Sequence, residues 1–140
     1  DHRDLHLSLR RQRQMCIRDS PVAVGMPGWE TPTGTFRVIE KIDQPIWVHP
    51  VTGERVEEQG PDNPLGSHWI AFHRDCLGRD AHDGETWVTI KGCTTTGFHG
   101  TPHRWTVGRA ISHGCVRLYN EDVRRLYGQV KLGTQVTVLP

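Results

Sequence analysis

A histidine and a cysteine, each set beside a glycine, are the residues of this sequence best suited to chemistry. His99 stands in the run F-H-G-T, and Cys115 follows sixteen positions later in the run S-H-G-C-V-R-L. A cysteine thiol has a pKa near ~8.5 and is only slightly ionised at neutral pH, so it needs a base to become a strong nucleophile. An imidazole brought to its side by the fold is such a base. The pair therefore predicts nucleophilic acyl transfer.

The glycine before the cysteine supports this interpretation. Gly114 favours a tight turn that lifts the Cys115 thiol out of a sheet. Such a turn also lets the N–H groups of Gly114 and Cys115 point at one spot, where two donors stabilise a developing oxyanion by several kcal/mol. The alternative is that Cys115 is a small buried apolar residue in a turn. A position between a glycine and an arginine-containing strand is a poor core site, which favours the catalytic interpretation.

Three neighbours of the cysteine have a structural interpretation as well as a functional one. In an extended strand His113 would share a face with Cys115, so it is either a rival base or a residue that shapes the pocket. Ser112 would orient a ring or hold the turn, the alternative being a simple turn hydroxyl. Arg117 would either receive a substrate carboxylate or form a structural ion pair. The residue types leave each of these alternatives open.

No metal or redox motif accompanies these residues. The four cysteines show no C-x-x-C spacing, and H-E-x-x-H is absent. A zinc site of His99, His113 and Cys115 has a reasonable ligand set, but no carboxylate is placed to act as its base. We therefore expect neither a metal ion nor a cofactor.

Cys76 and Cys93 flank a polar connection and a predicted strand. If residues 69–73 and 86–91 paired as a hairpin, the two thiols could reach disulfide distance in an oxidising compartment. The alternative is two buried free thiols, and the sequence does not decide between them.

Short strands must position these residues. The chain has 140 residues, enough for one domain, and its five Trp, fifteen Gly and nine Pro indicate strands joined by tight turns. The strands are expected at residues 21–25, 36–42, 47–49, 69–73, 86–91, 116–118 and 135–139, with a further extended piece beginning at Phe98. Residues 54–66 are expected as a long loop, and residues 74–85 as a connection or a hairpin insertion. No βαβ alternation is visible, which argues against a doubly wound sheet.

One short helix is expected at about residues 121–128. Asn120 would cap it, and Glu121 and Asp122 suit the positive end of its dipole. Gly128 would end it. Its apolar stripe consists of Val123, Leu126 and Tyr127.

Residues 1–20 show neither strand alternation nor a helical stripe. Residues 15–20, M-C-I-R-D-S, match the translation of a transposon-end sequencing adaptor. We therefore expect residues 1–20 to be non-native, the alternative being a genuine basic, disordered tail. The domain would then span residues 21–140 without its first strand, and no export signal is visible.

The motifs together resemble a known family. The runs F-H-G-T and I-S-H-G-C-V-R-L-Y-N-E-D-V are similar to the active-site signature of the L,D-transpeptidases, the YkuD-type domain of bacterial cell walls. Residues 22–38, residues 60–66 (G-P-D-N-P-L-G) and the closing V-K-L-G-T-Q-V-T-V resemble it in the same order. The resemblance covers residues 21–140 and implies a mainly β fold, a β-sandwich of short strands with one late helix.

The resemblance also implies a mechanism. Cys115 would be the nucleophile and His99 the general base and acid, its imidazole oriented by the backbone carbonyl of Gly100. The family's donor is a peptidoglycan stem tetrapeptide, from which the thiol displaces D-alanine by attacking the third residue. The thioester passes to an amine of a neighbouring stem, giving a 3→3 cross-link, or to a lipoprotein lysine. Carbapenem-type β-lactams acylate the same cysteine, and the implied location is the bacterial periplasm or cell envelope.

Other functions remain open at this point. With water as the acceptor the enzyme would be an L,D-carboxypeptidase, and a domain without catalysis would be a peptidoglycan-binding module. Intact Cys115, His99 and Gly114 disfavour the binding module. A net charge of +1 gives no sign of a nucleic-acid partner, and no apolar run approaches the ~20 residues that span a membrane.

Overall fold

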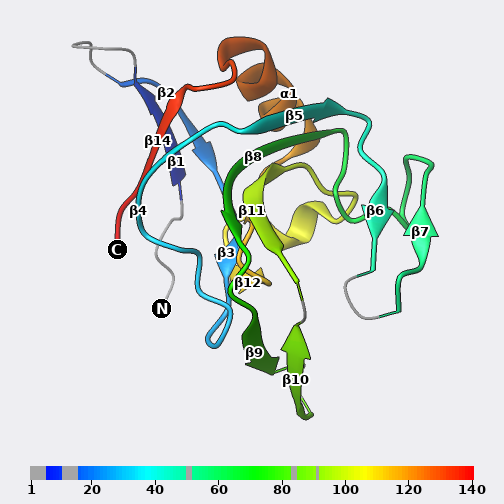
Figure 1. Ribbon diagram of the computed structural model, residues 1–140. Coiled ribbons are helices and arrows are strands. Elements are labelled where there is room, and N and C mark those ends of the chain that lie inside the picture. Colours follow the sequence, from blue (N-terminus) through cyan, green and yellow to red (C-terminus); the bar gives the residue numbers. More distant parts are fainter. Residues whose placement is uncertain (1–5, 11–15, 50–51, 83–84, 91) are drawn as a thin grey trace.

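The chain forms a mainly β structure with one α-helix, as the sequence predicts (Figure 1). The computed structural model describes residues 6–10, 16–49, 52–82, 85–90 and 92–140. Its elements are β1 (His6–Arg10), β2 (Cys16–Pro21), β3 (Val24–Gly25), β4 (Gly34–Arg37), β5 (Glu40–Asp43), β6 (Trp47–Val48), β7 (Arg55–Val56), β8 (His68–Asp75), β9 (Arg79–His82), β10 (Trp87–Ile90), β11 (Thr94–His99), the 3₁₀ helix η1 (Arg104–Thr106), β12 (Ala110–Ser112), β13 (Val116–Arg117), α1 (Asn120–Gln129) and β14 (Gln135–Val138).

A four-stranded sheet lies at the centre of the molecule, with its strands in the order β13-β11-β8-β5. The long strand β8 pairs antiparallel with β5 on one side and with β11 on the other. The edge strand β13 pairs parallel with β11. The sequence segments that hold the predicted base and nucleophile are thus adjacent in space.

One face of this sheet forms the core. Ile70 and Phe72 of β8, Phe98 of β11 and Val116 of β13 belong to one buried cluster, and the ring centroid of Phe72 lies 5.0 Å from that of Phe98. Helix α1 packs against β8 and β11 and contributes the buried Val123 and Leu126, as its predicted stripe indicates. Burying each large apolar side chain contributes roughly 2 kcal/mol. Because side chains alternate along strands, the residues between these core positions face away from it.

The ends of α1 differ from the prediction. The N-cap residue is Tyr119, whose side chain makes no capping hydrogen bond. Asn120, the predicted cap, is the first residue of the helix, and its side chain accepts the N–H groups of two other segments instead. Gly128 lies inside the helix, which continues to Gln129. The Val130 N–H donates to the Leu126 carbonyl, and Val130 is buried in the core. Packing of that residue therefore extends the helix past the glycine.

The strand expected at residues 36–42 is two strands. β4 pairs with β14, whereas β5 pairs with β8, so the chain changes sheets between them. The Val38 N–H donates to the Thr134 carbonyl, and the next amide, of Ile39, donates to the Ala71 carbonyl. The expected strand is thus divided by hydrogen bonds to two segments that are distant in sequence.

The hairpin considered for residues 69–73 and 86–91 is also wrong. β10 pairs with β9, which lies in residues 74–85, the segment expected as a connection or a hairpin insertion. The two strands project from the bottom of the central sheet (Figure 1). The expected long loop, residues 54–66, contains β7, which pairs with β6. The strand expected at residues 21–25 is not continuous: Pro21 ends β2, Ala23 forms an isolated bridge with Arg117, and the last two residues form β3.

Two strands lie in the N-terminal segment, where no regular structure was predicted. β1 and β2 pair antiparallel, while residues 1–5 and 11–15 lie outside the described residues. The origin of residues 15–20 stays a prediction. Within the described part of the chain, no helix is long and apolar enough to cross a membrane.

Candidate active site

The parallel pairing of β11 with β13 brings the predicted nucleophile and base to one face of the sheet. In this register Phe98 pairs with Val116, and His99 pairs with Arg117. Since Phe98 and Val116 lie in the core, His99 and Arg117 face the opposite side, and the alternation places Cys115 with them. His99, at the end of β11, and Cys115, directly before β13, therefore lie on the same face of the sheet.

The imidazole of His99 is held by the main chain. Its Nδ1 lies 2.6 Å from the carbonyl oxygen of Gly100, the orienting group that the resemblance implies. Because a carbonyl oxygen can only accept, Nδ1 carries the proton, which leaves the Nε2 lone pair free to accept one. His99 is buried, and burial with the nearby Arg117 charge lowers its pKa to about 4, against main-chain hydrogen bonds at Gly100 and Leu65 that raise it. The His99 imidazole is therefore neutral at pH 7.

Cys115 is a free, partly buried thiol. Burial raises its pKa, while a backbone hydrogen bond at Gly97 and the Arg117 charge act to lower it. The Sγ atom lies 3.7 Å from the carbonyl oxygen of Thr95, so the thiol sits against β11. At neutral pH the two side chains are thus a thiol and a neutral imidazole.

The turn before Cys115 is fixed by hydroxyl groups. Gly114 has φ +111°, a conformation that side chains other than glycine rarely adopt. The Ser112 hydroxyl donates to the Cys115 carbonyl at 2.6 Å and accepts the Gly114 N–H at 3.2 Å. The Thr31 hydroxyl donates to the Gly114 carbonyl at 2.8 Å. Ser112 therefore holds the turn, and the Gly114 amide expected to bind an oxyanion is directed at Ser112 instead.

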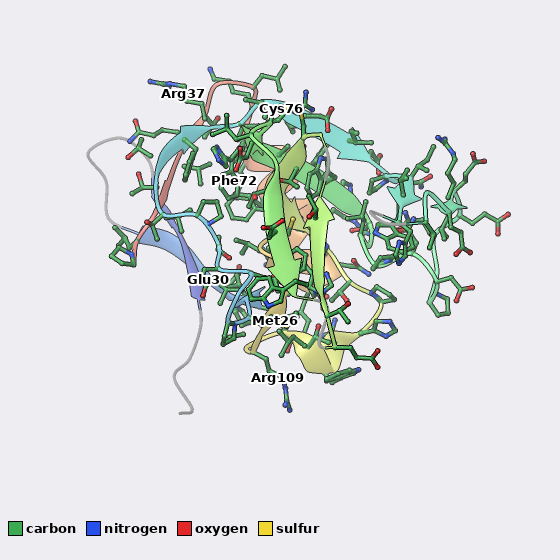
Figure 2. The ribbon with its side chains drawn as sticks, turned by 60° about the horizontal axis from the view of Figure 1, so that its bottom comes forward. Met26, Glu30, Arg37, Phe72, Cys76 and Arg109 are labelled. Carbon is green, nitrogen blue, oxygen red and sulfur yellow. A yellow bond between two sulfur atoms is a disulfide. The ribbon has the colours of Figure 1, made fainter. Side chains whose placement is uncertain are left out.

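A neighbouring strand supports the same turn. β3 runs parallel to β12, and the Met26 N–H donates to the Ser112 carbonyl at 2.9 Å. Figure 2 shows Met26 and Arg109, which lie next to these two strands in the sequence, on the same side of the molecule. The site is therefore assembled from segments at both ends of the sequence.

His113 lies beside Trp29. The two ring centroids are 4.6 Å apart. Burial and the Arg117 charge lower the pKa of His113. The arrangement fits the pocket-shaping role among the two that the sequence allowed.

Arg117 is a partly buried cation without a carboxylate partner among the described residues. None of the salt bridges found there involves it, and its buried Nε has no hydrogen-bond partner in the described part of the protein. Its charge acts on His99, Cys115 and His113. These contacts favour an anionic ligand over a structural ion pair.

Sequence reasoning missed two residues near His99. Trp69 pairs with His99 in the β8–β11 register, its ring centroid 6.1 Å from the imidazole, and its Nε1–H donates to the Glu40 carboxylate. The alternation within the predicted strand at residues 69–73 is the signal that could have found Trp69. Asn120 was assigned only to the helix, and no local signal points to its contacts.

Cys76 and Cys93 form a disulfide. Cys76 directly follows β8 and Cys93 directly precedes β11, so the bridge joins neighbouring antiparallel strands at the base of the β9–β10 hairpin. The bridge thus arises from a strand pair other than the one considered from the sequence. Among the described residues, no three His, Cys, Asp or Glu side chains form a group that could hold a metal ion.

The chain matches the family of L,D-transpeptidase catalytic domains, YkuD, over residues 4–138. YqjB of Bacillus subtilis is 33% identical over 117 residues, which are 84% of this chain and 56% of YqjB. ErfK/SrfK of Salmonella typhimurium is 30% identical over 132 residues, 85% of this chain and 36% of that protein. Both carry names of the L,D-transpeptidase group. The chain spans about half the length of these curated relatives, or less.

Solved structures share the fold. The catalytic domain of the Enterococcus faecium L,D-transpeptidase acylated by ertapenem superposes with a TM-score of 0.63 at 20% identity, covering 97% of this chain and 90% of that one. The Ldtfm-avibactam carbamoyl enzyme gives a TM-score of 0.65 at 19% identity, covering 98% of this chain and 46% of that one. At these identities the likeness shows the fold alone.

Proposed function

The chain belongs to the YkuD family of L,D-transpeptidase catalytic domains, and on that basis we propose that it transfers a peptidoglycan stem peptide through a thioester on Cys115. The observation that carries this proposal is the β11–β13 register, which puts Cys115 and His99 on one face of the sheet, outside the core. A thiol and a correctly protonated imidazole on the same face are the groups that acyl transfer requires.

In the first step the Cys115 sulfur attacks the carbonyl carbon of the third residue, a diamino acid, in a stem tetrapeptide. The thiol proton passes to Nε2 of His99, because Nδ1 keeps its own proton in the bond to Gly100. The carbonyl becomes an oxyanion. When it re-forms, the amide bond to D-alanine breaks and His99 returns the proton to the leaving amine.

In the second step an amine attacks the thioester on Cys115. His99 takes the proton from that amine, and the sulfur leaves and recovers a proton to restore the thiol. An amine of a neighbouring stem gives a 3→3 cross-link, and a lipoprotein lysine gives protein attachment. Water in place of the amine gives the L,D-carboxypeptidase reaction.

The oxyanion is stabilised by the Cys115 backbone N–H in this proposal. Because Ser112 accepts the Gly114 N–H, the second donor joins only if the hydroxyl turns away during the reaction. A single well-placed donor stabilises the transition state by about 3 kcal/mol.

Arg117 binds a carboxylate of the donor peptide. Its charge lies close to Cys115, and its buried Nε has no partner among the described residues. A carboxylate there would fill the missing hydrogen bond and offset the charge that lowers the pKa of His99. Binding of the donor would thus make the base stronger.

We propose that the protein acts in the bacterial periplasm or cell envelope, where peptidoglycan lies. The Cys76–Cys93 disulfide supports this location, since such bridges persist in oxidising compartments. β-Lactams are the inhibitors we expect. Proteins of this fold have been solved acylated by ertapenem and as an avibactam carbamoyl enzyme.

The test is incubation of the protein with a stem tetrapeptide and an amine acceptor, followed by mass spectrometry. We expect D-alanine release, a transfer product, and a covalent adduct that Cys115→Ala abolishes. Exclusive hydrolysis would identify a carboxypeptidase. A folded protein that binds the peptide but neither releases D-alanine nor forms an adduct would be a binding module, and the proposal would fail.

A further inference from the structure

We propose that Asn120 is a positioning residue for His99, acting through the peptide group that joins Gly100 to Thr101. The inference deepens the proposed function, since it assumes that His99 moves the proton. It rests on contacts of the Asn120 side chain with two loops of the central sheet.

One side-chain oxygen connects these loops. Oδ1 of Asn120 accepts the N–H of Ser67, before β8, and the N–H of Thr101, after β11, each at 3.1 Å. The Ser67 hydroxyl lies 3.4 Å from the Asn120 backbone carbonyl. Asn120 thereby ties the start of α1 to both loops next to the base.

The Thr101 N–H and the Gly100 carbonyl belong to the same peptide group, which is planar. Asn120 Oδ1 holds the N–H edge of this plane, and His99 Nδ1–H bonds to its C=O edge at 2.6 Å. Fixing one edge fixes the other, so Asn120 sets where the carbonyl meets the imidazole. A hydrogen bond donated by the N–H also polarises the carbonyl and strengthens it as an acceptor.

The packing leaves no room for a different side chain in these loops. A Cβ atom at Gly100 would collide with Oδ1 of Asn120, and one at Gly66 would collide with Oδ1, the Gly100 carbonyl carbon and the Thr101 nitrogen. Gly66 also has φ +67°, which favours glycine. The two glycines thus create the space that the amide of Asn120 occupies.

Loss of the amide frees the peptide group. Glycine at position 100 imposes little restriction of its own, so the carbonyl can turn away from His99 Nδ1. The imidazole can then place its proton on Nε2, where it cannot accept the thiol proton of Cys115. The acylation rate would then fall because His99 is in the wrong tautomer, whereas the groups that bind the donor would be unchanged.

The experiment compares Asn120→Ala and Asn120→Asp with the wild type and with Val123→Ala, a buried residue of the same helix. Asn120→Asp keeps an oxygen acceptor, whereas Val123→Ala weakens helix packing without touching either loop. The readouts are the acylation rate at saturating donor, KM, and the His99 tautomer from nitrogen chemical shifts of the free protein. Thermal unfolding monitors folding.

We expect Asn120→Ala to lower the acylation rate about 10- to 100-fold with little change in KM, and to raise the fraction of His99 protonated at Nε2. Asn120→Asp should recover most of the rate and the Nδ1 tautomer, and Val123→Ala should change only stability. A folded Asn120→Ala protein with the wild-type tautomer overturns the inference, as does the same tautomer change in Val123→Ala.

Two further outcomes remain decisive. If no protein releases D-alanine, the proposed function fails, but the tautomer in the free protein still decides the role of Asn120. If Asn120→Ala does not fold, Asn120→Ser carries the test at neutral pH, well above the pKa of His99. Its shorter side chain moves the oxygen away from the Thr101 N–H, so the Thr101 amide and His99 ring signals must both shift from their wild-type positions. A His99 signal that stays at its wild-type position while the Thr101 signal moves overturns the inference.

Discussion

His99 Nδ1 lies 2.6 Å from the carbonyl oxygen of Gly100, so a main-chain carbonyl and not a carboxylate orients this imidazole. A neutral orienting group does not stabilise imidazolium as a charged partner would. Burial therefore dominates, and the pKa of His99 falls to about 4.

This low pKa predicts a loss of stability in acid. The pKa of His99 is about 4 when folded, against ~6.5 for an ordinary histidine. Between these values the unfolded chain binds more protons, so the contribution of His99 is complete above pH ~6.5 and decreases as the pH falls to about 4, by about 3 kcal/mol in all. Denaturant unfolding of wild type and His99→Gln across this range measures it, and the variant should show the shallower pH dependence.

The control is His103→Gln, at an exposed position four residues further along. If it reduces the pH dependence as much as His99→Gln does, burial of His99 is not the cause.

The charge of Arg117, unpaired among the described residues, predicts that its removal weakens donor binding. Arg117→Met should raise KM for a carboxylate-bearing donor about 10- to 100-fold, because a charge-assisted hydrogen bond contributes about 1.5–3 kcal/mol. It should also raise the pKa of Cys115 further, since the Arg117 charge acts to lower it. Donor kinetics and the pH profile of thiol alkylation test the two effects. Arg125→Met, at an exposed arginine of α1, is the matched control, and an equal rise in KM there would contradict the assignment.

Alanine substitution at two glycines should change the stability of the protein in opposite directions. Gly114→Ala forces a side chain into φ +111° and should destabilise the protein by roughly 1–3 kcal/mol while slowing acylation of Cys115. Gly128→Ala lies within α1, where a Cβ atom meets nothing within 4 Å, and should stabilise by about 0.5–1 kcal/mol. Urea unfolding of both variants is the measurement. Equal and small effects would show that the turn before Cys115 is not strained.

The disulfide should contribute to stability without contributing to catalysis. Cys76 and Cys93 are 17 residues apart, and closing a loop of this size stabilises by about 3 kcal/mol. The double substitution Cys76→Ser and Cys93→Ser should lower the free energy of unfolding by that order and leave Cys115 acylation in the folded protein unchanged. Acylation that falls in the folded double variant would instead link the β9–β10 hairpin to the site.

Local features made part of this protein predictable. A few neighbouring residues are enough to identify the reactive types of His99 and Cys115, the glycines beside them and the apolar stripe of α1. This is because side-chain reactivity, φ preference and helical periodicity are local properties. The mainly β fold with one late helix follows from the same kind of signal and is confirmed. The family follows from these motifs as well.

Contacts between distant segments decided the rest. Residues 36–42 form two strands because Val38 and Ile39 donate hydrogen bonds to different segments. Asn120 does not cap the helix because its side chain accepts the amides of Ser67 and Thr101. The Gly114 amide is directed at Ser112, although the sequence alone allowed it to bind an oxyanion. A backbone group bonds to whichever partner the tertiary structure brings to it, and the sequence near that group does not name the partner.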